Sequence, residues 1–315
     1  MVHLDDPGIS NILLDDIDLT DERFRISRPR RDDALARSIA AFGILVPPIL
    51  LPAGIKHVIV TGHNRLEALR GLGEAKAGCR LAETVSPDAL RRHVLEKAYA
   101  NALGPVGKLR GLHILRMAGA DDTVVNDVAA AGLGIPRDFI ADDGLVAGVL
   151  DLPVPLRRFL DQRDIPFKSI KALMMLPAGA RAFLSNWVDA YYLRLNIFRD
   201  VVEMILDICR RDGFPGESLG LSPVPGRESH QEESRLHEAL FALRYPGYHG
   251  VMRNVEPLLE EYRRKEITLV LPPYLDGSAL EARLHFDRKD SRLAITEKLS
   301  RIKPEDIRSL LDLLS

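Results

Sequence analysis

The sequence predicts an α/β domain, then an all-α domain, then a small α+β segment. Three observations lead to this fold class. Residues 1–115 mix short apolar runs with amphipathic helices, residues 116–211 keep a helical period, and residues 212–234 are rich in Gly, Pro, Ser and charge. We therefore expect an N-terminal domain at 1–115, a helical domain of the helix-turn-helix type at 116–211, a linker at 212–234 and a C-terminal segment at 235–315.

The composition is that of a globular protein, with 46% hydrophobic and 28% charged residues. The formal net charge is −2, so any DNA contact must come from a local basic patch. Cys79 and Cys209 lie far apart, and no histidine has metal-ligand spacing, so no metal site is expected. The chain has neither the pattern of a signal peptide nor an apolar run that could span a membrane, and the cytoplasm is the expected compartment.

Five elements are expected in the first domain, and the helix that follows the second strand is treated below. Residues 33–42 place apolar side chains on one helical face, and Gly43 follows where a left-handed residue ends a helix. Two apolar runs at 46–51 and 57–62 read as strands separated by Pro52 and Gly54. A later helix begins after Ser86, whose hydroxyl suits an N-cap.

The junction between the second strand and the next helix carries the chemistry. Gly62 lets the backbone approach an anion, and the first amides of the following helix have no intrahelical partner. His63, Asn64 and Arg65 add side-chain donors in the same turn, and the guanidinium fork of Arg65 suits phosphate oxygens. The sequence therefore predicts a phosphate pocket, and a plain α/β junction is the alternative. The inward face of this helix is expected to hold Leu66, Leu69 and Leu72.

The stretch RISRPRRDDALARSIAAFGILVPPILL, followed by TGHNRLEALRGLG, resembles the N-terminal domain of the ParB family, whose phosphate motif is Gly-Glu-Arg-Arg. The resemblance implies binding of CTP with Mg²⁺. In it Arg30, Gly62 and Arg65 match family positions, whereas His63 and Asn64 replace Glu and Arg.

The family's second motif, Glu-Asn…Arg, falls on LEKAYANALGPVGKL. Glu96 matches the motif's glutamate, whereas Lys97 stands for Asn and Ala100 for Arg. The resemblance therefore implies that one residue which contacts the triphosphate and one residue on the side of the metal ion are replaced in this chain. Anion binding is expected, and nucleotide hydrolysis is left open.

The segment DTVVNDVAAAGLGIPRDFIADD resembles the helix-turn-helix that follows in ParB proteins. Its expected recognition helix carries Arg137 but also three carboxylates, so a helix-turn-helix kept only as a folding unit is the alternative. A basic stretch follows, and it too could be an ordinary solvated surface. The candidate DNA-binding residues are Arg137, Arg157, Arg158, Arg163, Lys168 and Lys171.

In the C-terminal segment we expect two amphipathic helices, strands at 267–273, 280–286 and 292–297, and a final helix. The last two strands flank a polar turn and suit a hairpin. These elements fit self-association as a homodimer. A hydrophobic core formed within the segment of a single chain explains them equally well.

The leading functional hypothesis is a ParB-like, partition-type protein that binds double-stranded DNA and is switched by CTP. The alternatives are an inactive adaptor, or an enzyme of the same superfamily that transfers phosphoryl groups or hydrolyses a nucleotide such as ATP. Glu22 and Glu67 are the candidate bases for such an enzyme.

Overall fold

The computed structural model describes residues 8–27, 33–213, 220–272, 279–284 and 292–314. They form two compact units. Unit 1 comprises Met1–Val202 and Phe214–Ser229, and unit 2 comprises Glu203–Gly213 and His230–Ser315. The domain boundaries expected from the sequence stay predictions, and one helix, α4 (Pro105–Met117), runs across the first of them.

Unit 1 begins with a five-stranded mixed sheet in the order β1-β5-β3-β4-β2. Neighbours β1 and β5 are antiparallel, as are β3 and β4, whereas β3 lies parallel to β5 and β2 parallel to β4. The hairpin β3–β4 confirms the two strands expected at 46–51 and 57–62, but Pro52 lies within β3, paired with His57, and does not separate the strands. The strands are β1 (Ile9–Leu13), β2 (Ile17–Asp18), β3 (Ile49–Ala53), β4 (Lys56–Thr61) and β5 (Lys76–Leu81).

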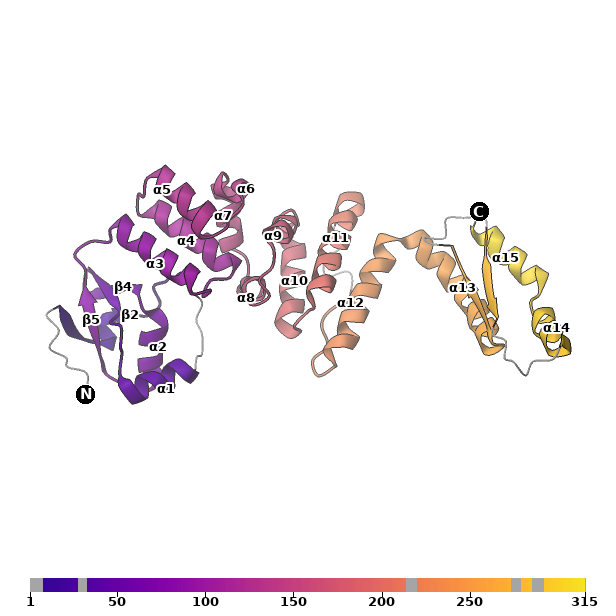
Figure 1. Cartoon of the computed structure of the whole chain (residues 1–315), viewed down its shortest axis with the longest axis horizontal. Coiled ribbons are helices and arrows are strands. Elements are labelled where there is room, and N and C mark those ends of the chain that lie inside the picture. The colour runs from indigo at the N-terminus through magenta and orange to yellow at the C-terminus, as the bar shows by residue number, and fades with distance from the viewer. Residues whose placement is uncertain (1–7, 28–32, 214–219, 273–278, 285–291, 315) are drawn as a thin grey trace. The chain divides into compact units, whose positions relative to one another are not determined.

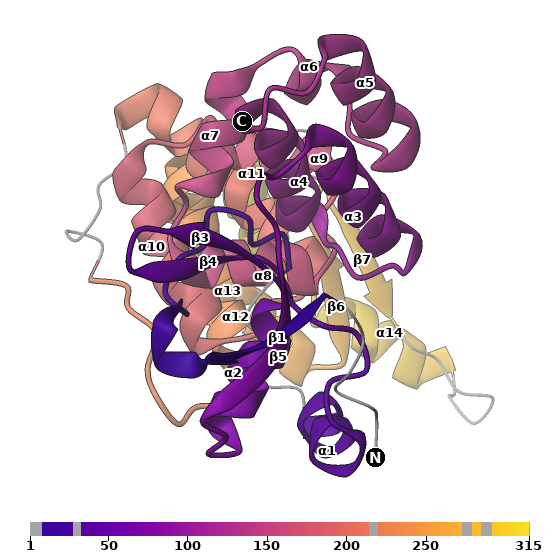
Figure 2. The ribbon, with the colours of Figure 1, turned by 90° about the vertical axis from the view of Figure 1, so that its left-hand side faces the viewer.

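Two helices, α1 (Asp33–Phe42) and α2 (His63–Gly71), cover this sheet from below in Figures 1 and 2. Leu66 and Leu69 of α2 join the sheet in one core, as predicted. The inward placement expected for Leu72 is wrong, because α2 ends at Gly71 and Leu72, its C-cap, is 43% exposed. Gly43 ends α1 with φ 72°, and its N–H donates to the Ile39 carbonyl at 2.8 Å.

The rest of unit 1 is helical. Its first helix is α3, and the Ser86 hydroxyl caps it by accepting from the Ala89 N–H at 3.2 Å, as predicted. A Cβ on Gly111 of α4 would meet a Val94 methyl at 2.9 Å, so glycine allows α4 to pack closely on α3. The helices are α3 (Pro87–Tyr99), α4, α5 (Asp122–Asp127), the π-turn η2 (Val128–Gly132), α6 (Arg137–Ile140), α7 (Asp143–Leu150), α8 (Val154–Gln162), α9 (Phe167–Met174), α10 (Ala178–Ala190) and α11 (Leu195–Asp212), which continues into unit 2.

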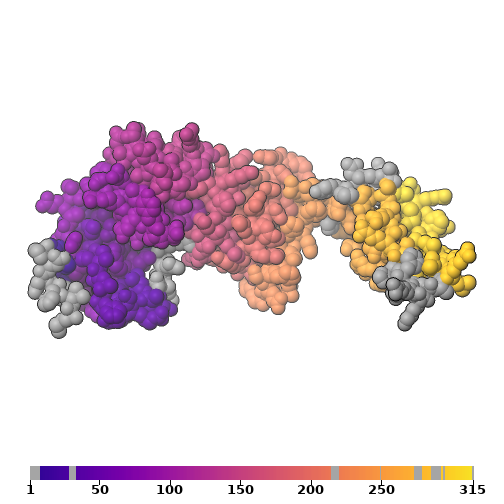
Figure 3. Space-filling model, in the orientation of Figure 1, coloured from indigo at the N-terminus to yellow at the C-terminus, as the bar shows by residue number. Residues whose placement is uncertain are grey.

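The sheet and the helices of unit 1 belong to one folded body. α3 and α4 lie above the sheet in Figures 1 and 2, opposite α1 and α2. In the space-filling view, the indigo and violet atoms of the α/β part continue without a break into the magenta helical part (Figure 3). The buried side chains of the helical part include Leu109, Leu112, Phe159 and Trp187. The predicted order of an α/β part followed by helices is confirmed.

Unit 2 has a core of its own, formed by Val255, Tyr262, Ile267, Leu269 and Leu310. Strands β6 (Ile267–Val270) and β7 (Glu281–Leu284) pair antiparallel. This confirms the predicted α+β character of the segment, whereas self-association as a homodimer stays a prediction. The helices of unit 2 are α12 (Ser229–Arg244), α13 (Pro246–Arg264), α14 (Arg292–Ser300) and α15 (Pro304–Leu314).

One predicted element of unit 2 is wrong. Residues 292–297 form the first part of helix α14 instead of a strand. The expected hairpin partner, β7, pairs with β6 instead, so no ladder from β7 draws residues 292–297 into extended structure. The Leu, Ala, Glu and Lys residues of RLAITEKLS then follow their helical propensity. The polar turn expected between the two strands lies outside the described residues.

Within the ranges given above, no helix combines the length and the apolar character needed to cross a bilayer.

Candidate functional site

The junction between β4 and α2 is built around Gly62. Its φ of 100° is left-handed, and a Cβ there would lie 2.8 Å from the Cβ of Pro48. The Gly62 carbonyl accepts from the amides of Arg65 and Leu66 at 2.9 and 3.1 Å, but no side chain caps the start of α2. The first amides of α2 are therefore left for a ligand, and the helix dipole adds positive potential there.

This first turn opens on a cleft of about 1250 Å³. The end of α1 and the loop after it form one wall, and α3 with the start of α4 forms another. The Gly132–Gly134 turn and the end of α8 complete it. All of these segments belong to unit 1. Four basic side chains line the cleft, namely Arg65, Lys97, Lys108 and Arg158, together with the acidic Glu96, Asp161 and Asp164.

Arg65 lies across the floor of the junction. Its Nη1 donates to the carbonyl of Val46, and its Nη2 would lie 3.2 Å from a Cβ on Gly62. Burial lowers the pKa of Arg65, whereas the nearby charge of Glu96 raises it. A guanidinium stays protonated at neutral pH and offers five N–H donors, so donors remain for an anion in the cleft.

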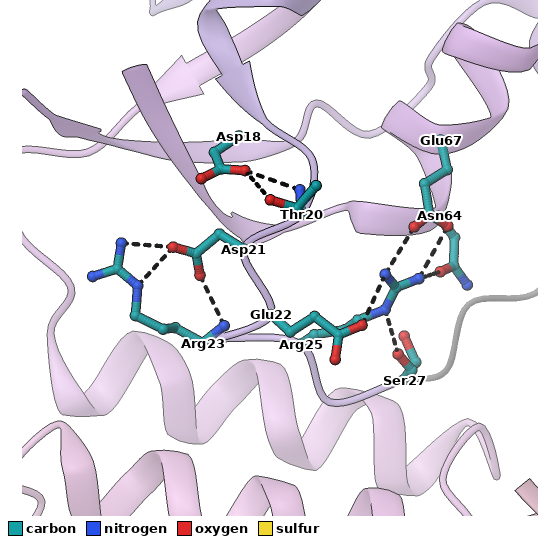
Figure 4. A network of polar contacts seen from close by, with 9 residues as sticks. All are labelled: Asp18, Thr20, Asp21, Glu22, Arg23, Arg25, Ser27, Asn64 and Glu67. Carbon is teal, nitrogen blue, oxygen red and sulfur yellow. Dashed lines mark hydrogen bonds and ion pairs between the residues drawn. The ribbon is translucent and has the colours of Figure 1, made fainter. Parts of the chain in front are cut away.

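Behind the first turn of α2 lies a polar network around Arg25, which sequence reasoning missed (Figure 4). The Arg25 side chain is only 3% exposed, and its guanidinium pairs with both carboxylate oxygens of Glu67, at 2.8 and 3.0 Å. Glu22 approaches the same guanidinium at 3.7 Å, and the Arg25 Nε donates to the Ser27 carbonyl at 3.2 Å. Both candidate bases, Glu22 and Glu67, therefore face a buried cation.

The same network orients Asn64. Arg25 Nη2 donates to the side-chain oxygen of Asn64 at 3.1 Å. Because a guanidinium has donors and no acceptor, the amide oxygen of Asn64 must face it. The two N–H donors of the amide are therefore not used by Arg25, and Asn64 lines the cleft. This arrangement suits the donor role predicted for Asn64.

His63 has a different environment from its two neighbours. The side chain is buried, its ring is hydrogen-bonded to the backbone of Asp21, and its Nε2 has no partner in the described part of the chain. Burial, helped by the nearby charge of Arg25, lowers the pKa of His63 to about 4, against the weaker opposing effects of Glu67 and Asp21. His63 is therefore neutral at pH 7 and adds no charge to the site.

Unit 1 is expected to lose stability as the pH falls below 6.5, the ordinary pKa of histidine. Between that pH and about 4 the unfolded chain binds a proton that folded His63 does not, so stability is lost as the pH drops through this window. The loss from His63 reaches about 3 kcal/mol. Urea unfolding followed by the fluorescence of Trp187, which is buried in unit 1, measures it.

His63→Gln is expected to reduce this pH dependence without abolishing it, because the pKa of His93 is also lowered to about 4 by burial and its contribution has the same sign. The control is His113→Gln, because His113 is an exposed histidine on α4. A His63→Gln protein with the wild-type pH dependence would contradict the assignment.

α3 and α4 bring the other predicted residue, Glu96, into the cleft together with groups that sequence reasoning missed. Glu96 is exposed and lines the cleft, as do His93 and Lys97 of the same helix and Lys108 of α4. Burial and the nearby charge of Lys97 lower the pKa of His93 to about 4. Helical spacing on α3 could have pointed to His93, but nothing local could have pointed to Lys108. Arg30, predicted to bind phosphate, lies outside the described residues.

The carboxylates of the expected recognition helix are largely neutralised. This segment is divided into the short helix α6 and helix α7. Asp138 pairs with Lys171 at 2.6 Å, Asp143 pairs with Arg116, and Asp142 caps α7 by accepting from the Leu145 N–H at 2.8 Å. The repulsion of phosphates expected from three free carboxylates is thereby reduced.

The predicted basic residues do not form one surface. Arg158 lines the cleft, and Arg163 stacks on the Tyr192 ring at 3.5 Å while donating to the Tyr192 carbonyl at 3.0 Å. Lys171 is paired with Asp138. Arg157 is half-buried close enough to Arg110 to lower the pKa of that guanidinium. The remaining two, Arg137 and Lys168, are exposed.

The donor set of the cleft is a poor match for Mg²⁺, which in nucleotide sites is held by one or two carboxylates together with the phosphates, because the carboxylates Asp161 and Glu96 are engaged with other groups. Asp161 already accepts from the amides of Val106 and Gly107, at 2.7 and 3.2 Å. Glu96 lies close enough to Arg65 to raise the pKa of the Arg65 guanidinium. The next residue on α3, Lys97, is also basic and lines the cleft. Among the described residues, no group of three His, Cys, Asp or Glu side chains could hold a metal ion.

No family model matches the chain. Over 157 residues it is 26% identical to a probable chromosome 1-partitioning protein ParB of Deinococcus radiodurans, covering 50% of this chain and 52% of the relative. Over 148 residues it is 29% identical to a probable chromosome-partitioning protein ParB of Neisseria meningitidis serogroup A, covering 45% and 48%. The chain therefore spans about half the length of the curated relatives it matches.

Two solved structures of truncated ParB from Caulobacter crescentus are also similar. The complex with CTP-γ-S is 18% identical and covers 58% of this chain and 99% of that one, with a TM-score of 0.26. The match to the complex with the centromeric parS site is 14% identical and covers 62% of this chain and 98% of that one, with a TM-score of 0.30. These scores are too low to transfer any geometry from those complexes to this chain.

Proposed function

We propose, from the premise that this chain is a ParB-like protein, that its cleft binds a nucleoside triphosphate, with CTP as the first candidate. The bound nucleotide switches how the chain associates with double-stranded DNA, as a partition-type protein would require.

The observation that carries this proposal is the uncapped first turn of α2 at the edge of a cleft whose lining includes Arg65, Lys97 and Lys108. Free amides, the Asn64 amide group and Arg65 converge there, which is the donor arrangement that binds phosphate groups. A volume of about 1250 Å³ accommodates a nucleotide, because ligand pockets in proteins measure roughly 300–1,000 Å³. The buried Arg25 network supports the turn from behind.

For DNA we propose contact through the exposed Arg137 and Lys168, with α5, η2 and α6 acting as the helix-turn-helix. The pairing of Asp138 with Lys171 and of Asp143 with Arg116 favours this proposal, because it reduces the negative charge that a phosphate backbone would meet.

Isothermal titration of the full chain with CTP and then ATP, with and without nonspecific duplex DNA, tests the proposal. CTP binding that DNA strengthens or weakens supports the switch. Binding of ATP alone favours an enzyme of the same superfamily. A folded protein that binds neither nucleotide contradicts the proposal.

Arg65→Ala is expected to weaken nucleotide binding by about tenfold or more, because a charge-assisted hydrogen bond to phosphate is lost. The control is Arg70→Ala, which removes an exposed arginine from the other end of the same helix. Titration calorimetry measures both variants, and equal affinities for the two would count against a phosphate contact by Arg65.

A further inference from the structure

We infer that the cleft binds its polyphosphate ligand without a divalent cation, and that Lys97 and Lys108 supply the counter-charge instead. The inference rests on the proposed function and names the ionic form of the ligand. It starts from the disagreement between the Mg²⁺ that the family resemblance implies and the side chains that line this cleft.

The carboxylates of the cleft are poorly placed to hold Mg²⁺. Asp161 is held against the start of α4, because its Oδ1 accepts from the amides of Val106 and Gly107. Glu96 lies close to the charge of Arg65, which opposes the binding of a dication. Asp164 lies beyond the end of α8, in the left-handed turn before α9.

The two lysines are placed as counter-charges for an anion. Both are half-buried on the cleft walls, and neither forms an ion pair with another described residue. Lys108 stands in the first turn of α4, where the positive end of the helix dipole opposes a cation. A bound anion would relieve both the partial burial of these charges and this unfavourable placement.

The lysines also lie on two different helices that face the same cleft as Arg65. A polyphosphate that contacts the first turn of α2 would therefore meet fixed ammonium groups on the wall built by α3 and α4. Ammonium groups neutralise phosphate charge as point charges and need no particular coordination geometry.

The test is titration of the full chain with CTP in excess EDTA and again in saturating Mg²⁺. We expect dissociation constants that agree within about threefold, which corresponds to less than 1 kcal/mol. Lys97→Met and Lys108→Met are each expected to weaken binding in EDTA by about tenfold, because methionine keeps the apolar stem and removes the charge. Lys56→Met, an exposed lysine on β4 outside the cleft, is the control and should change nothing.

Binding that requires Mg²⁺ would overturn the inference and leave the proposed function standing. If folded protein binds CTP in neither buffer, the proposed function fails. In that case, titration with inorganic tripolyphosphate in EDTA tests the inference separately. If tripolyphosphate binds and both lysine variants weaken its binding, the inference is supported. If tripolyphosphate does not bind, the inference is overturned. Trp187 fluorescence shows that each variant is folded.

Discussion

Gly62→Ala is expected to lower the free energy of unfolding of unit 1 by about 3 kcal/mol and to abolish nucleotide binding. Two costs add. The φ of 100° strains any residue with a Cβ, and that Cβ would lie 2.8 Å from the Pro48 Cβ and 3.1 Å from its Cα. Pro48 has little freedom to shift away from this Cβ. Its ring restricts the backbone, and its carbonyl accepts a hydrogen bond from the Arg80 N–H at 2.8 Å.

Binding suffers together with stability because the same glycine fixes the start of α2. Its carbonyl accepts the first hydrogen bonds of the helix, and a Cβ on it would lie 3.2 Å from the Arg65 Nη2. Relief of the clash must therefore move the free amides or Arg65, which are the groups proposed to bind phosphate.

Gly54→Ala is the matched control. Gly54 has φ 67° at the tip of the β3–β4 hairpin, but nothing lies within 4 Å of a Cβ there. It carries only the backbone strain, about 1 kcal/mol, and should bind nucleotide normally. Urea unfolding and titration calorimetry measure both variants. Equal losses of stability at Gly54 and Gly62 would show that packing against Pro48 has no effect.

Glu67→Leu is expected to destabilise unit 1 by about 3 kcal/mol or more, because it leaves the buried cation of Arg25 without its main partner. The guanidinium is 3% exposed and both of its contacts with Glu67 are close, at 2.8 and 3.0 Å. The remaining carboxylate, Glu22, is 3.7 Å away and half exposed, so it compensates little. Thermal and urea unfolding measure the loss.

Glu22→Leu provides the control on the same guanidinium, with an expected cost below about 1 kcal/mol. The double variant Arg25→Met with Glu67→Leu is expected to recover much of the stability, because it removes both charges together. If the double variant is no more stable than Glu67→Leu alone, the loss does not come from an unpaired charge. Its nucleotide affinity then reports whether Arg25 is needed to orient Asn64.

The elements that could be predicted from the sequence follow local rules. Helix α1 and its end at Gly43, the β3–β4 hairpin and the cap at Ser86 each depend on a few neighbouring residues, and all were predicted. The strand–glycine–helix junction at Gly62 was predicted for the same reason, because the first amides of any helix lack intrahelical partners, and its role in phosphate binding stays a proposal.

Which distant residues meet at that junction depends on the packing of the whole domain. Arg25 and Glu67 are 42 positions apart, and the first turn of α4 reaches the cleft only when that helix packs on α3. The helical state of residues 292–297 was likewise decided by a distant choice, the pairing of β7 with β6. Periodicity and capping describe contacts within one or two turns of the chain, whereas these outcomes depend on which surfaces the core brings together.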